Sequence, residues 1–184
     1  MKTKTLKCKC CKERFTPINN NSLQKYCMQK DECITAHYTY VKTIQRKSWN
    51  KRKREAKEKL KTKQDYEKEL EPIFNEFIRK RDKDKPCISC GKKAGAFTLT
   101  AGHYYPAGSY KNLRFDEDNV HGQCWWDCNK NKSGNLIEYR IGLINRIGKA
   151  RVATLEAHRL VGMKYSIDEL KEMKIYYKQK IKDL

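Results

Sequence analysis

Four cysteines enclose a Gly-His pair in the middle of the chain, and their spacing constrains the fold more than any other feature. Cys87 and Cys90 form a Cys-x2-Cys pair, and Cys124 and Cys128 form a Cys-x3-Cys pair. Thiolates at such spacings are typical ligands of structural zinc, which holds two distant pieces of backbone together. His103 lies between the two pairs. We therefore predict a small zinc-braced domain that holds this imidazole in a fixed place.

A second group of cysteines lies near the N-terminus. It begins with another Cys-x2-Cys pair and is followed by a turn-rich stretch. We predict a finger-like unit with its own zinc, because a unit this small needs a metal to fold. His37 is the alternative fourth ligand, and Cys10 is either free or a competing ligand. The predicted ligands of this second zinc are Cys8, Cys11, Cys27 and Cys33.

The charge of the chain favours a polyanionic partner. Among 184 residues there are 42 Lys and Arg against 22 Asp and Glu, a formal net charge of +20. Such a charge promotes strong, salt-sensitive binding to nucleic acid. Lysine-rich composition for solubility is the alternative, but the basic residues are concentrated between Lys42 and Lys63. Charged residues make up 35% of the chain and apolar residues 38%, so we expect no large continuous core.

The N-terminal sequence Met-Lys-Thr-Lys-Thr-Leu-Lys contains no apolar run of signal-peptide length. In a reducing compartment, clustered thiols are expected to bind metal and not to form disulfides. No stretch approaches the roughly eighteen apolar residues of a membrane span. We therefore expect a soluble cytoplasmic protein with no membrane partner, in the host cytoplasm if a phage encodes it.

The pattern of apolar residues predicts an α+β, mostly helical chain in four segments. Residues 1–40 form the finger-like unit, and residues 41–85 form a basic helical arm. Pro72 either interrupts the helix of this arm or opens a second helix. Residues 86–148 form the zinc-braced domain, with strands near 97–105 and 120–122 and a helix from about 133 to 147 that Gly148 ends.

The C-terminal segment, residues 149–184, is expected to form helices at 149–161 and 167–183. Ser166 and Glu169 form a capping box for the second helix. Its apolar stripe contains Leu170 and Tyr177, and we expect this stripe to dock on the core of the chain. The alternative is a homodimer seam.

The residues around the cysteine clamp suit the hydrolysis of a phosphodiester. This reaction needs a base near neutral pH and a cation at the phosphate. His103 is the candidate base, because the unperturbed pKa of histidine is about 6.5. Asn129, directly after Cys128, offers a carbonyl oxygen to Mg²⁺ or Mn²⁺. Asn119 is expected to orient the His103 loop by hydrogen bonding.

Several further residues are candidate contacts to DNA. Arg114 and Arg140 are candidates for the scissile phosphate, with ordinary surface arginines as the alternative. Tyr104 is a candidate for stacking on an unpaired base. We expect at least one of Trp125 and Trp126 to pack under the zinc loop. The remaining predicted DNA-binding residues are Lys51, Arg52, Lys53, Arg54, Lys57, Lys59, Lys130 and Lys132.

The ordered motifs resemble those of a known nuclease family. Cys-x2-Cys, Gly-His, Asn and Cys-x3-Cys-Asn occur in the order of the HNH, or ββα-metal, nucleases of the zinc-braced branch. The strings Ala-Gly-His-Tyr at 101–104, Leu-Arg-Phe-Asp-Glu at 113–117 and Lys-Ser-Gly-Asn at 132–135 more closely resemble the NinG (Rap) family of phage recombination proteins. The resemblance is dense over about 86–150. It implies a structure-specific endonuclease that acts on branched recombination intermediates such as D-loops and Holliday junctions.

The sequence departs from the usual HNH pattern at two places. Gly102 stands where most members have a metal-binding Asp, and Asn129 replaces the final histidine. Asp116, Asp118 and His121 are therefore candidate additional ligands of the catalytic cation. Two other functions remain open: a non-catalytic zinc-finger protein that binds DNA or regulates transcription, and an HNH endonuclease that recognises sequence instead of DNA shape.

Overall fold

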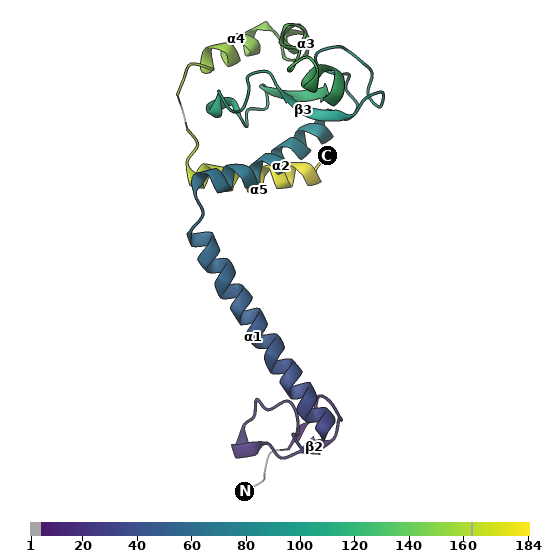
Figure 1. Ribbon diagram of the computed structural model, residues 1–184, viewed down its shortest axis with the longest axis vertical. Coiled ribbons are helices and arrows are strands. Elements are labelled where there is room, and N and C mark those ends of the chain that lie inside the picture. The colour runs from purple at the N-terminus through teal and green to yellow at the C-terminus, as the bar shows by residue number, and fades with distance from the viewer. Residues whose placement is uncertain (1–4, 163) are drawn as a thin grey trace. The chain divides into compact units, whose positions relative to one another are not determined.

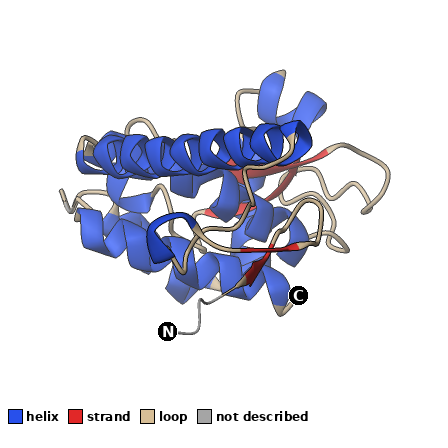
Figure 2. Cartoon of the chain, turned by 90° about the horizontal axis from the view of Figure 1, so that it is seen from below, coloured by secondary structure: helices blue, strands red, loops and turns tan. Residues whose placement is uncertain are grey.

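The computed structural model describes residues 5–162 and 164–184. The chain forms two compact units, Met1–Leu60 and Lys61–Leu184. This division differs from the predicted boundaries after residues 40 and 85, because the basic segment belongs to the first unit and the following helix to the second. The fold is α+β and mostly helical, with short strands (Figure 2).

The first unit combines a cysteine cluster with a long helix. Strands β1 (Leu6–Lys7) and β2 (Arg14–Phe15) pair antiparallel, and a short 3-10 turn, η1 (Ile18–Asn20), follows. Helix α1 (Asp31–Lys59) then runs without a break (Figure 1). Cys33, in its first turn, is its buried residue. The rest of α1 has no apolar face. It is stabilised by its backbone hydrogen bonds, by acidic residues in its first turn and by basic residues in its last turn.

The second unit begins with helix α2 (Lys63–Arg81). Thr62 and Asp65 form a capping box at its N-terminus. One face of α2 is apolar and buried, with Phe74, Phe77 and Ile78. They pack with residues of helix α5 (Ile167–Lys182), which lies beside α2 (Figure 1).

Pro72 neither interrupts nor opens a helix, so this prediction is wrong. It lies inside α2 with its ring exposed, and the break in the chain comes earlier, between Lys59 and Thr62. An internal proline costs about 3 kcal/mol. Burial of Leu70 and Phe74 on either side of it outweighs this cost, because each large apolar side chain contributes about 1.5–3 kcal/mol.

A two-stranded antiparallel sheet lies between helices in the second unit. Strands β3 (Leu99–His103) and β4 (Val120–Cys124) confirm the predicted pair. A 3-10 turn, η2 (Lys111–Leu113), lies in the connection between them. The register joins Gly102 to His121 and Thr100 to Gln123, so these four residues share one face. The other face, with Ala101 and Val120, packs against α2.

The elements after the sheet follow the predicted order. A π-helical turn, η3 (Trp125–Lys130), leads to helix α3 (Leu136–Ile147). Gly148, with a φ of 85°, ends α3 and precedes α4 (Lys149–His158). Tyr139 of α3 donates a hydrogen bond to the carbonyl oxygen of Gly102 (2.8 Å), so α3 packs on the sheet face opposite α2.

Helix α5 confirms the predicted capping box of Ser166 and Glu169. Leu170 and Tyr177 are buried against α2, so the apolar stripe docks within the chain. Among residues 5–162 and 164–184, no helix combines the length and apolar character needed to cross a membrane.

Candidate metal centres and active site

Each unit contains a cluster of four cysteine thiols that could hold a metal ion. In each cluster the four sulfur atoms lie within 4.8 Å of one another, and together they match the predicted ligand sets: Cys8, Cys11, Cys27 and Cys33 in the first unit, and Cys87, Cys90, Cys124 and Cys128 in the second. Cys33 completes the first cluster, whereas His37 packs edge-on against Tyr26. Cys10 lies outside the cluster.

The sulfur separations fit tetrahedral zinc. Cys8 Sγ lies 3.7 Å from Cys33 Sγ, and Cys90 Sγ lies 3.5 Å from Cys124 Sγ. Four sulfurs at about 2.3 Å from a tetrahedral zinc ion are about 3.8 Å apart. All nine cysteines of the chain are free of disulfides. The donor set and spacing therefore suit zinc in both clusters.

Backbone N–H groups point at the sulfurs of both clusters. Cys27 N donates to Cys8 Sγ (3.4 Å), and Cys124 N donates to Cys87 Sγ (3.3 Å). Burial favours a higher pKa for the Cys8 thiol, but backbone hydrogen bonds outweigh it and lower the pKa to about 6. Burial raises the pKa of Cys33 and Cys124 above the usual thiol value. Four thiols this close together can all be deprotonated only when a bound cation offsets their negative charges.

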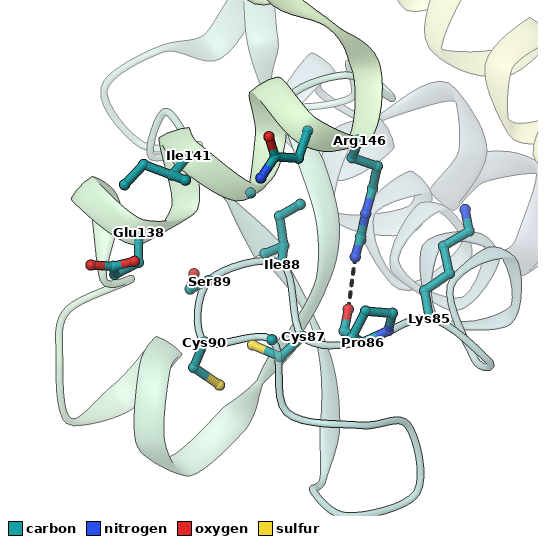
Figure 3. A pocket seen from close by; sticks show the side chains of 12 residues that line it. Lys85, Pro86, Cys87, Ile88, Ser89, Cys90, Glu138, Ile141 and Arg146 are labelled. Carbon is teal, nitrogen blue, oxygen red and sulfur yellow. Dashed lines mark hydrogen bonds between the residues drawn. The ribbon is translucent and has the colours of Figure 1, made fainter.

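The Cys87–Cys90 loop is held tightly against α3. A Cβ atom on Gly142 would lie 1.8 Å from the carbonyl oxygen of Ile88, so only glycine permits this approach. Arg146 Nη2 donates to the carbonyl oxygen of Pro86 (2.7 Å), and Figure 3 shows this bond beside a pocket of about 520 Å³. His103 and Asn129 do not line this pocket.

His103 is the last residue of β3 and is partly buried on the α2 side of the sheet. Its Nε2 lies 3.0 Å from the carbonyl oxygen of Arg114. A carbonyl oxygen can only accept, so Nε2 carries the proton and Nδ1 has the free lone pair. Burial lowers the pKa of His103 below its usual value. At neutral pH the imidazole is therefore uncharged, with Nδ1 able to accept a proton.

Arg114 is held by two carboxylates of α2. Its Nη2 lies 2.7 Å from Glu71 Oε2 and its Nη1 3.3 Å from Glu67 Oε2. Arg114 thus ties α2 to the loop whose carbonyl group orients His103. Its predicted role at the scissile phosphate requires that a phosphate compete with these two carboxylates.

Asn119 is fully buried and all its side-chain contacts hold the loop after β3. Its Oδ1 accepts from Tyr105 N (2.7 Å), and its Nδ2 donates to the carbonyl oxygens of Tyr105 (3.0 Å) and Leu113 (2.9 Å). Asn119 therefore positions the segment that carries His103, and its amide has no capacity left for substrate.

Asn129 lies on the opposite side of the sheet from His103. It is partly exposed in η3, and its Nδ2 donates to Gln123 Oε1 (3.1 Å). Gln123 belongs to the sheet face that packs towards α3, together with Gly102. The predicted base and the predicted cation ligand therefore lie towards opposite faces of the sheet, and Asn129 contacts Gln123, the side chain that packs over Gly102.

His121 does not fit its predicted role as a cation ligand. Its Nε2 donates to the carbonyl oxygen of Asp118 (3.1 Å), and its Nδ1 accepts from Arg81 Nη2 (3.1 Å). Burial lowers the pKa of His121, so the ring stays neutral in this arrangement. With both nitrogens in use and 3% of the residue exposed, His121 suits neither a cation ligand nor a general base.

Comparison with known proteins decides the family. The sequence model for the Bacteriophage Lambda NinG protein matches residues 1–184. The chain belongs to the NinG family. It is 38% identical to Protein ninG of Escherichia phage 933W over 97% of this chain and 92% of that protein. It is 45% identical to Protein ninG of Escherichia phage lambda over 64% of this chain and 56% of that protein. No solved structure matches the chain.

The predicted DNA-binding residues of this NinG family member are divided between its two units. The α1 residues are all exposed: Lys51, Arg52, Lys53, Arg54, Lys57 and Lys59. In the second unit, Lys130 and Lys132 are exposed, and Lys130 lies 4.3 Å from the ring centre of Trp126. Arg140 is exposed but paired with Glu156 (2.7 Å), so DNA would have to displace that carboxylate.

Two predictions about aromatic residues of this NinG chain are wrong. Tyr104 is buried, with its ring stacked on Tyr139 and its hydroxyl donating to Glu156, so it offers no face to a base. The chain turns into the core directly after β3, and this turn buries both Tyr104 and Tyr105. Trp125 and Trp126 are both exposed (44% and 58%), and Trp126 contacts Lys130, so neither indole packs under the zinc loop.

The sequence does not predict the buried charged residues that connect α2 to β4 and to the Arg114 loop in this NinG family member. Asp82, fully buried at the end of α2, accepts from Arg81 Nη2 (2.8 Å) and from Gly122 N (2.8 Å) of β4. Glu67 and Glu71 reach Arg114 in the same way. In a chain with 35% charged residues, residue type alone does not distinguish these three carboxylates from solvated ones. The one local signal was the spacing of Glu67 and Glu71, which places them on the same side of a helix.

Proposed function

We propose that this chain is a metal-dependent endonuclease that cleaves branched DNA, such as four-way junctions and D-loops. The observation that carries the proposal is the hydrogen bond from His103 Nε2 to the Arg114 carbonyl oxygen. It leaves Nδ1 of a neutral, partly exposed imidazole as the only ring atom able to take a proton. His121 makes a similar bond to a backbone carbonyl, but Arg81 occupies its Nδ1 atom, whereas His103 Nδ1 has no partner among the described residues.

The proposed reaction is hydrolysis of a phosphodiester. His103 Nδ1 removes a proton from a water molecule as its oxygen bonds to phosphorus. The bond from phosphorus to the leaving oxygen breaks, and the leaving oxygen takes up a proton from solvent water. The outer edge of β3 pairs with no strand among residues 5–162 and 164–184. A phosphate at this edge, beside Gly102 and His103, could be reached by side chains from both faces of the sheet.

Asn129 fits the role of ligand for Mg²⁺ or Mn²⁺. Its Oδ1 receives no hydrogen bond from any residue that the structure describes, and its Nδ2 is held by Gln123. Such cations prefer oxygen and keep several waters when they bind to proteins. When bound, the cation would supply positive charge at the scissile phosphate.

The remaining features support binding to DNA. Helix α1 has a basic, exposed surface that suits phosphate groups, and both cysteine clusters can brace their units with zinc. The motif resemblance to zinc-braced HNH nucleases and membership of the phage NinG family favour a recombination substrate. The second candidate is a zinc-dependent DNA-binding protein without catalysis, and α1 with the N-terminal cluster favours it.

One experiment separates these functions. Zinc-loaded full-length protein is incubated with labelled four-way, D-loop, flap and linear duplex DNAs, with Mg²⁺, with Mn²⁺ and with neither. The proposal predicts cleavage that needs the cation and is fastest on branched substrates. Tight binding without cleavage of any substrate would favour the non-catalytic protein, and cleavage of linear DNA at one sequence would favour a sequence-specific nuclease.

A further inference from the structure

Gln123 is a fully buried polar side chain next to the proposed active site. A buried amide needs partners for both of its ends. Its Nε2 donates to Ser89 Oγ (2.7 Å) and to the carbonyl oxygen of Gly134 (2.6 Å). The Gly134 oxygen can only accept, so the NH₂ group must face it. Gln123 Oε1 therefore points in the other direction.

The space into which Oε1 points exists because residue 102 is glycine. A Cβ atom at Gly102 would lie 2.3 Å from Gln123 Oε1 and 2.9 Å from Gln123 Cβ. Both separations are shorter than non-bonded atoms allow. Because Ser89 and Gly134 hold the amide, Gln123 cannot move aside without losing hydrogen bonds. Any side chain at position 102 would thus displace Gln123.

Gln123 Oε1 in turn determines which way the Asn129 amide faces. Asn129 Nδ2 donates to Oε1 at 3.1 Å. If the amide were reversed, two carbonyl oxygens would face each other at this distance, which is unfavourable. Because an amide is planar, holding Nδ2 inward turns Oδ1 outward. Asn129 is partly exposed, so its Oδ1 is accessible there.

We infer that Gln123 is a positioning residue that turns Asn129 Oδ1 towards a divalent cation, and that Gly102 is required to make room for it. This inference rests on the function proposed above. Ser89 lies within the Cys87–Cys90 loop, so the orientation of Asn129 depends on the cysteine cluster through Ser89 and Gln123. The glycine in place of the usual acidic residue is then part of an alternative way of holding the cation.

Cation binding tests the inference without DNA. Mn²⁺ binding to zinc-loaded full-length protein is measured by electron paramagnetic resonance for wild type, Gln123→Leu, Gly102→Ala and Asn129→Ala. Loss of a group that orients a metal ligand typically weakens binding about 10–100-fold. We expect this loss for Gln123→Leu and Gly102→Ala, and a loss at least as large for Asn129→Ala. The Gln123→Leu/Asn129→Ala double variant should bind no more weakly than Asn129→Ala alone.

The matched control is Gln179→Leu, the same substitution at an α5 amide that bonds Asp183. It should leave Mn²⁺ binding unchanged. Zinc content and thermal midpoint are measured for every variant, because Gln123→Leu also removes the donor to Ser89 and Gly134. If Gln123→Leu fails to fold, Ser89→Ala, which removes one anchor of Gln123, should give a smaller loss of Mn²⁺ affinity.

The amide orientation itself is tested by NMR of the ¹⁵N-labelled protein without Mn²⁺. The Asn129 NH₂ protons should exchange slowly in wild type and quickly in Gln123→Leu. Equal exchange in both, or unchanged Mn²⁺ affinity in a folded Gln123→Leu, would overturn the inference and leave the nuclease proposal intact. Slow exchange and Mn²⁺ binding in a wild type that cleaves no DNA would support the inference and overturn the nuclease proposal.

Discussion

The Nε2 atom of His103 donates a hydrogen bond to the main-chain carbonyl oxygen of Arg114, 3.0 Å away. Arg114 is in turn held in place by ion pairs between its side chain and Glu67 and Glu71 of α2. This arrangement fixes both the tautomer and the direction of the imidazole. A base held in this way needs no rearrangement before it accepts a proton.

The pH dependence of cleavage should follow the titration of His103. Burial lowers its pKa below the usual value of about 6.5, so the ring is neutral and active at pH 7. We expect cleavage to fall on the acid side with a midpoint below pH 6.5, measured as single-turnover rates at saturating Mg²⁺. A midpoint above pH 7 would mean that another group is the base.

Zinc content should depend on Cys33 and not on Cys10. Cys33 belongs to the first cluster, whereas Cys10, in the same unit, does not. We expect elemental analysis to give two zinc ions per chain in wild type and in Cys10→Ser, and one in Cys33→Ser. Two zinc ions in Cys33→Ser would show that His37 or Cys10 replaces it. Chelation should also unfold the second unit, since metal binding and folding are linked.

Asp82 should stabilise the folded state at neutral pH, and this stabilisation should be lost in acid. Burial favours a higher pKa for Asp82, but its interactions with His121, Arg81 and Lys85 outweigh burial and hold this pKa well below the usual range. The folded state therefore binds this proton less readily than the unfolded state, and the contribution is present above about pH 4 and lost as the pH falls further.

Asp82→Asn is the corresponding variant. It leaves Arg81, Lys85 and Arg146 without their carboxylate, and removing one partner of a buried ion pair typically costs about 3–5 kcal/mol. We expect a loss of this size in urea unfolding at pH 7 and a smaller one at pH 3. Asp168→Asn, at an exposed α5 ion pair, should change stability by less than about 1 kcal/mol.

The basic surface of α1 should supply affinity for DNA of any form. Replacing Lys51, Arg52, Lys53 and Arg54 with glutamine should weaken binding to duplex and four-way DNA alike. In a plot of the logarithm of the binding constant against the logarithm of the salt concentration, the slope should become shallower by about 0.9 for each duplex phosphate that the variant no longer neutralises. Fluorescence anisotropy at several salt concentrations measures both effects. Unchanged duplex binding together with a loss of junction preference would show that α1 recognises DNA shape.

Local patterns predicted most of the second unit. The cysteine spacing predicted both clusters, and the apolar periodicity predicted β3, β4, α3 and the buried stripe of α5, because each of these features is marked by residues at short, regular spacings in the sequence. The break before α2 could also have been predicted, since Thr62 and Asp65 have the spacing of a capping box.

Other features depend on tertiary contacts that no short pattern encodes. Tyr104 resembled a stacking residue, but it is buried by packing on Tyr139 of α3. The partners of Arg114 come from residues more than forty positions away. The role of Gln123 depends on the room that the missing side chain of Gly102 leaves for it, and this contact follows only from the pairing of the strands.

The most direct test of the proposed function compares His103→Ala with His158→Ala. A general base typically contributes about 10²–10⁴-fold to the rate. With a labelled four-way junction and Mg²⁺, we predict that His103→Ala loses cleavage by this factor while its zinc content, thermal midpoint and junction affinity stay at the wild-type level. His158→Ala should cleave like wild type. A folded His103→Ala protein that cleaves at the wild-type rate would contradict the assignment of His103 as the base.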